Sequence, residues 1–181
     1  WRGVGWCREM RKAEVDALEA FRKAVDLGPA TFDADLRALA SARPKWRVLF
    51  RDAGWGSLRN DLDAWALAEF RALVAAAPED VNARLGLAFA LYRTRDYAGA
   101  VALCDALIRE GYSEAAEALV GRTKDGGRVR VVCGPVALRA WAQLRLGAHQ
   151  SAVDGFRAEV QARSDRADAR CGLGYALLAS G

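Results

Sequence analysis

Internal repetition is the feature of this 181-residue sequence that most restricts its fold. Trp6 and the glycine before it recur at Trp55, 49 residues later, followed at equal spacing by the same alanine, Phe-Arg pair and proline. A longer match without gaps relates residues 55–91 to residues 141–177. Such a match indicates duplication of a structural unit, and units of this size are typical of proteins that stack repeats.

Each repeated unit has the pattern of two helices. Ala66, Phe70 and Leu73 follow one another at intervals of three and four residues, which predicts an amphipathic helix. Pro78 ends that helix, and Asp80 can cap the next one. Because 52% of residues are hydrophobic, 28% are charged and good helix formers dominate, we expect a folded all-α chain. The expected helices lie near 3–12, 13–27, 32–43, 45–60, 62–77, 80–94, 96–110, 113–122, 135–147, 149–162 and 166–180.

Two extra segments interrupt the repeats, near residues 32–46 and 115–132. The first has the pattern of an additional helix that ends at Pro44. In the second, residues 129–132 are rich in valine, but a single strand would lack a partner. We therefore expect an extended loop or the frayed start of a helix there.

The spacing of small and large residues resembles the tetratricopeptide repeat. Gly54, Ala66, Phe70 and Pro78 occupy the family's small, small, aromatic and proline positions, although Cys104 stands where an aromatic residue is usual. The resemblance is to degenerate, bacterial-type repeats. It implies an all-α, right-handed superhelical solenoid of antiparallel helix pairs, which forms a single domain over residues 1–181. The implied units lie near 1–31, 47–80, 81–114, 133–166 and, in part, 167–181.

An aromatic residue recurs at one position in the first helix of successive units, and arginines recur four residues later. In the tetratricopeptide family this position faces the concave groove, where aromatic faces can stack and guanidinium groups can pair with carboxylates. Packing between neighbouring first helices explains the same recurrence, so both interpretations stay open. The candidate partner-binding residues are Trp6, Arg51, Trp55, Arg59, Phe89, Tyr92, Arg93, Trp141, Arg145 and Tyr175.

The resemblance implies a non-catalytic scaffold that binds a peptide or partner protein, with some acidic character, on its concave surface. One alternative is a subunit of a bacterial envelope assembly for exopolysaccharide export, with polysaccharide as the ligand. Another is a regulatory or spacer domain of a larger enzyme. Nucleic acid is disfavoured as a partner, because the net charge is only +4 and basic residues are spread among 23 acidic ones.

No pattern in the sequence supports catalysis, a cofactor or a metal site. His149 is the only histidine, and the four cysteines form no CxxC pair. The loop at residues 121–127 lacks the order of a phosphate-binding motif. We therefore expect a protein without enzymatic activity.

The cysteines and the apolar segments bear on the compartment of the protein and on where its natural chain ends. Three cysteines, Cys7, Cys104 and Cys171, fall in apolar helical patterns and should behave as small, reduced hydrophobic residues. That favours a reducing compartment such as the cytoplasm and leaves the periplasm open. No apolar run is long enough for a membrane span. Leu177 and Leu178 should lack a covering helix, so we expect the natural chain to continue beyond them.

Overall fold

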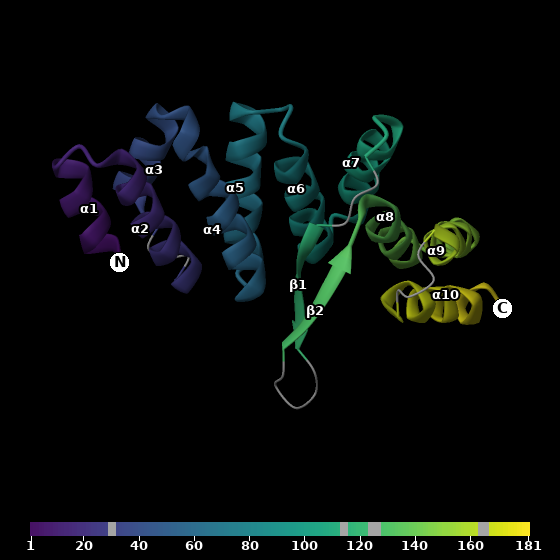
Figure 1. Ribbon diagram of the computed structural model, residues 1–181. Coiled ribbons are helices and arrows are strands. Elements are labelled where there is room, and N and C mark those ends of the chain that lie inside the picture. The colour runs from purple at the N-terminus through teal and green to yellow at the C-terminus, as the bar shows by residue number, and fades with distance from the viewer. Residues whose placement is uncertain (29–31, 113–115, 123–127, 163–166) are drawn as a thin grey trace. The chain divides into compact units, whose positions relative to one another are not determined.

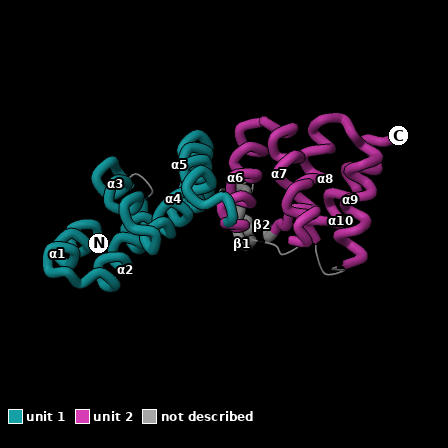
Figure 2. The backbone as a smooth tube through the Cα atoms, turned by 90° about the horizontal axis from the view of Figure 1, so that it is seen from above, with its two compact units in different colours: residues 1–79 teal, residues 80–181 magenta. Residues whose placement is uncertain are grey.

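The computed structural model describes residues 1–28, 32–112, 116–122, 128–162 and 167–181. These residues form two compact units, unit 1 over residues 1–79 and unit 2 over residues 80–181 (Figure 2). Among the described residues, no helix combines the length and the apolar character needed to cross a bilayer.

Unit 1 is built from consecutive helices that pack in pairs (Figure 1). Helix α1 packs on α2, α2 packs on α4, and α4 packs on α5. The additional helix expected near 32–43 is confirmed as α3. The elements are α1 (Arg2–Met10), α2 (Glu14–Leu27), α3 (Ala34–Ala42), the 3-10 helix η2 (Pro44–Arg47), α4 (Val48–Arg59) and α5 (Asp63–Ala76).

Unit 2 continues the same pattern with five helices and one hairpin in its described residues. Its elements are α6 (Val81–Arg93), α7 (Tyr97–Arg109), β1 (Ala116–Arg122), β2 (Arg128–Cys133), α8 (Pro135–Arg145), α9 (His149–Ala162) and α10 (Ala167–Ser180). Each helix packs on the next, and α8 also contacts both α6 and α10. The first helices of successive pairs, α6, α8 and α10, therefore form a row. The expected helical solenoid is confirmed.

The helix ends follow the local signals in the sequence. The Asp80 carboxylate accepts a hydrogen bond from the Ala83 N–H at 3.0 Å and caps α6. Asp96 caps α7 in the same way, through the Gly99 N–H at 2.9 Å. Helix α7 ends just before Gly111, whose φ of +82° is a conformation that glycine adopts without strain.

A glycine and two aromatic rings form the core contact of a hairpin. The Phe70 ring is fully buried, and its centroid lies 5.1 Å from that of Trp55 in an edge-on arrangement. A Cβ atom on Gly54 would come within 2.7 Å of this ring, so only glycine permits the close crossing of α4 and α5. Phe156 and Trp141 repeat the aromatic pair in α9 and α8, at 4.9 Å.

The second extra segment contains a β-hairpin, which corrects two sequence-based expectations. The helix expected near 113–122 is wrong, because residues 116–122 form strand β1. The valine-rich segment does have a partner, since β1 pairs antiparallel with β2 from Ala116 opposite Cys133 to Arg122 opposite Arg128. Helix propensity is a weak signal, and pairing with a valine-rich strand overrides it here. Residues 113–115 of the expected helix lie outside the described residues.

Candidate functional site

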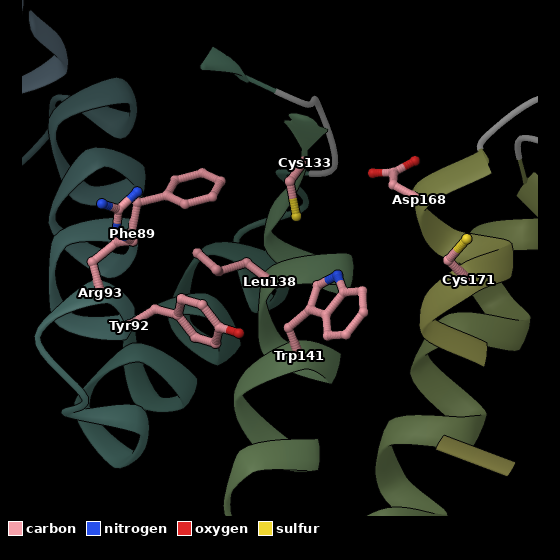
Figure 3. Close-up of a pocket in the computed structure, with 8 residues that line it drawn as sticks. All are labelled: Phe89, Tyr92, Arg93, Cys133, Leu138, Trp141, Asp168 and Cys171. Atoms are coloured by element: carbon pink, nitrogen blue, oxygen red, sulfur yellow. The ribbon is translucent and has the colours of Figure 1, made fainter. Parts of the chain in front are cut away.

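A pocket of about 380 Å³ opens on the row of first helices in unit 2. It takes side chains from all three helices of the row and from the last residue of strand β2, as Figure 3 shows. The lining residues are Phe89, Tyr92 and Arg93 from α6, Cys133 from β2, Leu138 and Trp141 from α8, and Asp168 and Cys171 from α10.

The pocket has an apolar interior and a more polar rim. Phe89 and Leu138 are each only 2% exposed, and Cys133 is buried beside them. Trp141 is half-buried, because its other side packs on Phe156 in the core of its own hairpin. The pocket therefore offers apolar carbon and one indole face to a ligand. Such surfaces favour burial of an apolar group of the ligand.

Charged groups of opposite sign stand on opposite walls of this pocket. Arg93 lies near the end of α6, and Asp168 lies near the start of α10 (Figure 3). A second cation, Arg145, ends α8 and is exposed. The Tyr92 hydroxyl accepts a hydrogen bond from the Arg145 guanidinium and thereby raises the pKa of Arg145. The α6 wall itself has a positive charge at neutral pH, because the guanidinium of Arg93 stays protonated there.

Four of the ten residues predicted from the sequence line this pocket together: Phe89, Tyr92, Arg93 and Trp141. Two more predicted residues lie nearby in unit 2. Arg145 contacts Tyr92, and the Tyr175 ring lies 6.3 Å from that of Trp141 with 63% of the residue exposed.

The remaining predicted residues belong to unit 1. Trp6 is half-buried and edge-on to Phe21 at 5.2 Å, and Trp55 is only 8% exposed. Arg51 and Arg59 are half-buried on α4. The two tryptophans thus contribute to hairpin packing, and the predicted common surface for arginines of both units stays a prediction.

The sequence did not single out Cys133, Leu138, Asp168 or Cys171 as site residues. Part of the signal was present, because Leu138 precedes Trp141 by three positions and Cys171 precedes Tyr175 by four. Residues at these intervals share one face of a helix. For Cys133 no local signal existed, because its place depends on the pairing of β1 with β2.

The four cysteines are free thiols in two different environments. Cys7 and Cys171 are exposed, although both fall in apolar helical patterns of the sequence. Cys104 is buried, and burial raises its pKa to about 12. Among the described residues, no three histidine, cysteine or acidic side chains are placed to hold a metal ion.

Comparison with known proteins identifies the repeat. Residues 64–116 match the family model described as tetratricopeptide repeat. The first TPR domain of the human RPAP3 protein superposes with a TM-score of 0.58 and 13% identity, covering 74% of this chain and 91% of that one. A structure of a MamA mutant superposes with a TM-score of 0.55 and 14% identity, covering 97% and 83%. No curated protein matches the sequence.

The stacked helical hairpins and the row of first helices define a helical-repeat protein of the solenoid class. Residues 64–116, from α5 to the first residue of β1, match the tetratricopeptide repeat, and the whole fold is similar to that of tetratricopeptide repeat domains. Domains of this family generally mediate protein–protein interaction and are typically non-catalytic scaffolds.

Proposed function

We propose that unit 2 binds a segment of a partner protein across α6, α8 and α10, with one apolar side chain held in the pocket. The observation that carries this proposal is the pocket itself. It gathers four residues that the repeat pattern singled out and places three aromatic rings and a leucine around one cavity. Buried aromatic and apolar anchors of this kind supply most of the affinity in many protein interfaces.

The size of the pocket supports an anchor rather than a complete small ligand. Its volume of about 380 Å³ lies at the lower end of the roughly 300–1,000 Å³ usual for ligand pockets. A single large apolar side chain suits such a volume, while the remainder of the segment would lie on the exposed row of helices. The partner-binding surface proposed here is therefore centred on Phe89, Tyr92, Arg93 and Trp141 rather than on the unit 1 tryptophans.

The positive charge on the α6 wall of the pocket supports a partner that has acidic residues. Arg93 lines the pocket and Arg145 lies beside Tyr92, so two cations stand on the same side of the cavity. A carboxylate next to the apolar anchor could pair with either guanidinium. The carbohydrate alternative has less support, because Trp55 is 8% exposed and presents no open ring face for a sugar.

The proposal can be tested by blocking the pocket from its exposed rim. Cys171→Trp adds a large side chain at an exposed lining residue, so the fold should tolerate the change. Ser151→Trp is the matched control, because Ser151 is exposed on α9 and its duplicate position in α5 already carries Trp65, which is 47% exposed. Peptides selected from a random twelve-residue library on the wild-type protein provide the probes.

Polarisation with the labelled peptides should show that Cys171→Trp raises Kd at least about tenfold, as loss of an anchor contact does. Ser151→Trp should leave Kd unchanged. Both variants must first show the wild-type helical circular dichroism. Equal binding by the Cys171→Trp variant would place the binding surface outside this pocket and refute the proposal.

A further inference from the structure

Two side chains of opposite charge line the pocket of unit 2 from the two outer helices of the row. Arg93 lies in the last turn of α6, and Asp168 lies in the first turn of α10. Helix α8 lies between them, since it contacts both α6 and α10. Figure 3 shows Arg93 with Phe89 on one side of the cavity and Asp168 with Cys171 on the other. The electrostatic potential therefore changes sign across the pocket.

The positive side of the pocket is held in place by packing within unit 2. The Tyr92 ring lies edge-on to that of Tyr97 at 5.4 Å, and its hydroxyl accepts a hydrogen bond from Arg145 of α8. Because Tyr92 is fixed from two directions, little side-chain entropy is lost on this side when a ligand binds. Arg93 lines the pocket next to Tyr92, and a guanidinium group pairs well with a carboxylate. This side is therefore suited to an acidic residue.

The negative side combines a carboxylate with an aromatic ring. Asp168 and Trp141 are both half-buried, and the Trp141 ring is positioned by Phe156 at 4.9 Å and Tyr175 at 6.3 Å. A cationic group that pairs with Asp168 can also lie over an aromatic face. The methylene groups of lysine or arginine can cover apolar surface along the way. This side is therefore suited to a basic residue.

The two pocket-lining residues of α10 both differ from their duplicates in α6. Asp168 stands where α6 has Asn82, and Cys171 stands where α6 has Leu85. Leu85 is fully buried, whereas Cys171 is exposed. A copy of α6 in this place would give the wall neither the negative charge nor the open edge. The negative side is thus a particular property of α10 and not a consequence of the repeat.

The order of these features across the row predicts the spacing of charges in a bound segment. Neighbouring packed helices lie about 8–10 Å apart. In an extended segment, residues two apart project to the same side, and the first and last of three such residues are about 13 Å apart. Long charged side chains at these two positions can reach both sides of the pocket while the central residue enters it.

We propose that the pocket selects an extended peptide segment with an acidic, a large apolar and a basic residue at alternate positions. The acidic residue pairs with Arg93, and the basic residue pairs with Asp168. The apolar residue lies among Phe89, Leu138 and Trp141. The inference rests on the proposed function and specifies the charges of the partner segment. A segment with two charges of the same sign places one of them against a like charge, which reduces affinity.

Three fluorescein-labelled, end-capped peptides of seven residues test the charge order. All have leucine at the fourth position and serine or glycine elsewhere, while the second and sixth positions hold glutamate and lysine, two glutamates or two lysines. Fluorescence polarisation with the full chain should show that the mixed peptide binds about three- to tenfold more tightly than the other two, as expected for one charge-assisted pair. A mixed peptide with serine instead of leucine should bind more weakly still, because it lacks the anchor.

Exchange of the two pocket charges should change the preference in a defined way. Arg93→Glu makes both sides negative and should favour the peptide with two lysines. Asp168→Lys makes both sides positive and should favour the peptide with two glutamates. The double variant Arg93→Glu/Asp168→Lys restores opposite signs and should again prefer the mixed peptide, because an extended segment can cross the row in either direction.

Two substitutions on α9 provide matched controls for these variants. Arg157 and Asp154 are exposed residues of α9 that do not line the pocket. Arg157→Glu and Asp154→Lys change the net charge as the pocket variants do, so they should keep the preference of the wild type. Helical circular dichroism confirms that each variant is folded.

Alkylation of Cys171 reports whether a peptide occupies the pocket. Cys171 is exposed at the pocket, and Cys7 is an exposed thiol of unit 1, so one protein contains both the reporter and its control. Saturation with the mixed peptide should slow the reaction of iodoacetamide with Cys171, because the reaction requires access to the thiolate. The reaction at Cys7 should be unchanged, and mass spectrometry measures both.

The outcomes separate this inference from the proposed function. Equal affinity of the three charged peptides, with Cys171 protected by each, would overturn the charge order and leave the apolar pocket supported. A folded double variant that does not regain its preference for the mixed peptide would also overturn it. Failure of all three peptides beside tight binding of library-selected peptides of another pattern would overturn the inference alone. Binding without protection of Cys171 would overturn both the inference and the proposed site.

Discussion

At the residue scale, the aromatic residue that recurs in the first helix of each unit mainly packs within its hairpin. Only Phe89 and Trp141 at this position also line the pocket. The rings of Trp6, Trp55 and Trp141 each lie edge-on to a phenylalanine of the same hairpin. Exposure at this position nevertheless runs from 2% for Phe89 to 63% for Tyr175. The neighbouring helices therefore decide whether an identical register position becomes core, pocket wall or surface.

Truncation of the hairpin phenylalanines should be costly. Phe70→Ala and Phe156→Ala each remove a ring that is fully buried, and each should lower the free energy of unfolding by about 3–5 kcal/mol. Chemical denaturation followed by circular dichroism measures the change. Tyr175→Ala, at a residue that is 63% exposed, serves as the control and should change stability much less. An unchanged transition for either phenylalanine variant would contradict the repeat register.

Two glycines of α10 should respond to the same substitution with opposite signs. A Cβ atom on Gly172 would collide with the Phe156 ring, whereas a Cβ atom on Gly174 would have no neighbour within 4 Å. Gly172→Ala should destabilise by about 1–3 kcal/mol through overpacking. Gly174→Ala should stabilise by about 0.5–1 kcal/mol through helix propensity. Thermal unfolding of both variants provides the test, and changes of the same sign would refute this packing.

At the element scale, an ion pair of the inserted helix α3 and an aromatic contact of Phe32, just before it, link this part of the chain to α5 and α4. Arg37 of α3 donates a hydrogen bond to the Glu69 carboxylate of α5 at 2.8 Å. The Phe32 and Phe50 rings meet edge-on at 4.9 Å. Glu69 is only 1% exposed, although its equivalent in α2 is Ala20. The pairing of Glu69 with Arg37 of the inserted helix explains why α5 has a buried carboxylate where α2 has an alanine.

Breaking this ion pair from its two sides should have unequal effects. Arg37→Ala leaves the Glu69 carboxylate buried without its partner and should cost about 1–3 kcal/mol, a range reduced because the Arg37 side chain is 32% exposed. Glu69→Ala removes the buried charge and should cost less. A double-mutant cycle by urea denaturation measures the coupling. Equal and additive effects would show that the pair does not hold α3 in place.

The hairpin shows the opposite relation between local propensity and structure. Alanine and glutamate in residues 115–120 favour a helix, and the valines of residues 129–132 favour a strand. The structure follows the valines, because antiparallel pairing satisfies backbone groups of both segments at once. Sequence periodicity over seven residues was too short to indicate this pairing.

At the scale of the whole molecule, the chain consists of two compact units, and the candidate site belongs entirely to the second. In unit 2 each helix packs on its successor, and α8 contacts both α6 and α10. Repeat arrays are stabilised by such contacts between neighbours. Unit 2 therefore contains the interactions that hold its own pocket together.

Residues 80–181 expressed alone should accordingly fold and keep the pocket. We expect a helical circular dichroism spectrum and a single cooperative thermal transition, because the packing of α6 to α10 is internal to this unit. The peptides selected on the full chain should bind the fragment with a Kd within about threefold of the original value. Residues 1–79 serve as the control and should not bind them. A fragment without a cooperative transition would show that unit 2 depends on unit 1.

Residue patterns alone predict the helices of the repeated units, the Asp80 cap and the close crossing at Gly54, because each depends on residues a few positions apart or on an internal repeat. They also identify half of the pocket lining, since Phe89 and Trp141 occupy equivalent repeat positions. The tertiary structure alone decided the pairing of β1 with β2, the burial of Trp55 and the meeting of Cys133 with Cys171 in one cavity. These features join residues that are distant in the sequence, and local patterns contain no information about which distant segment will supply the partner.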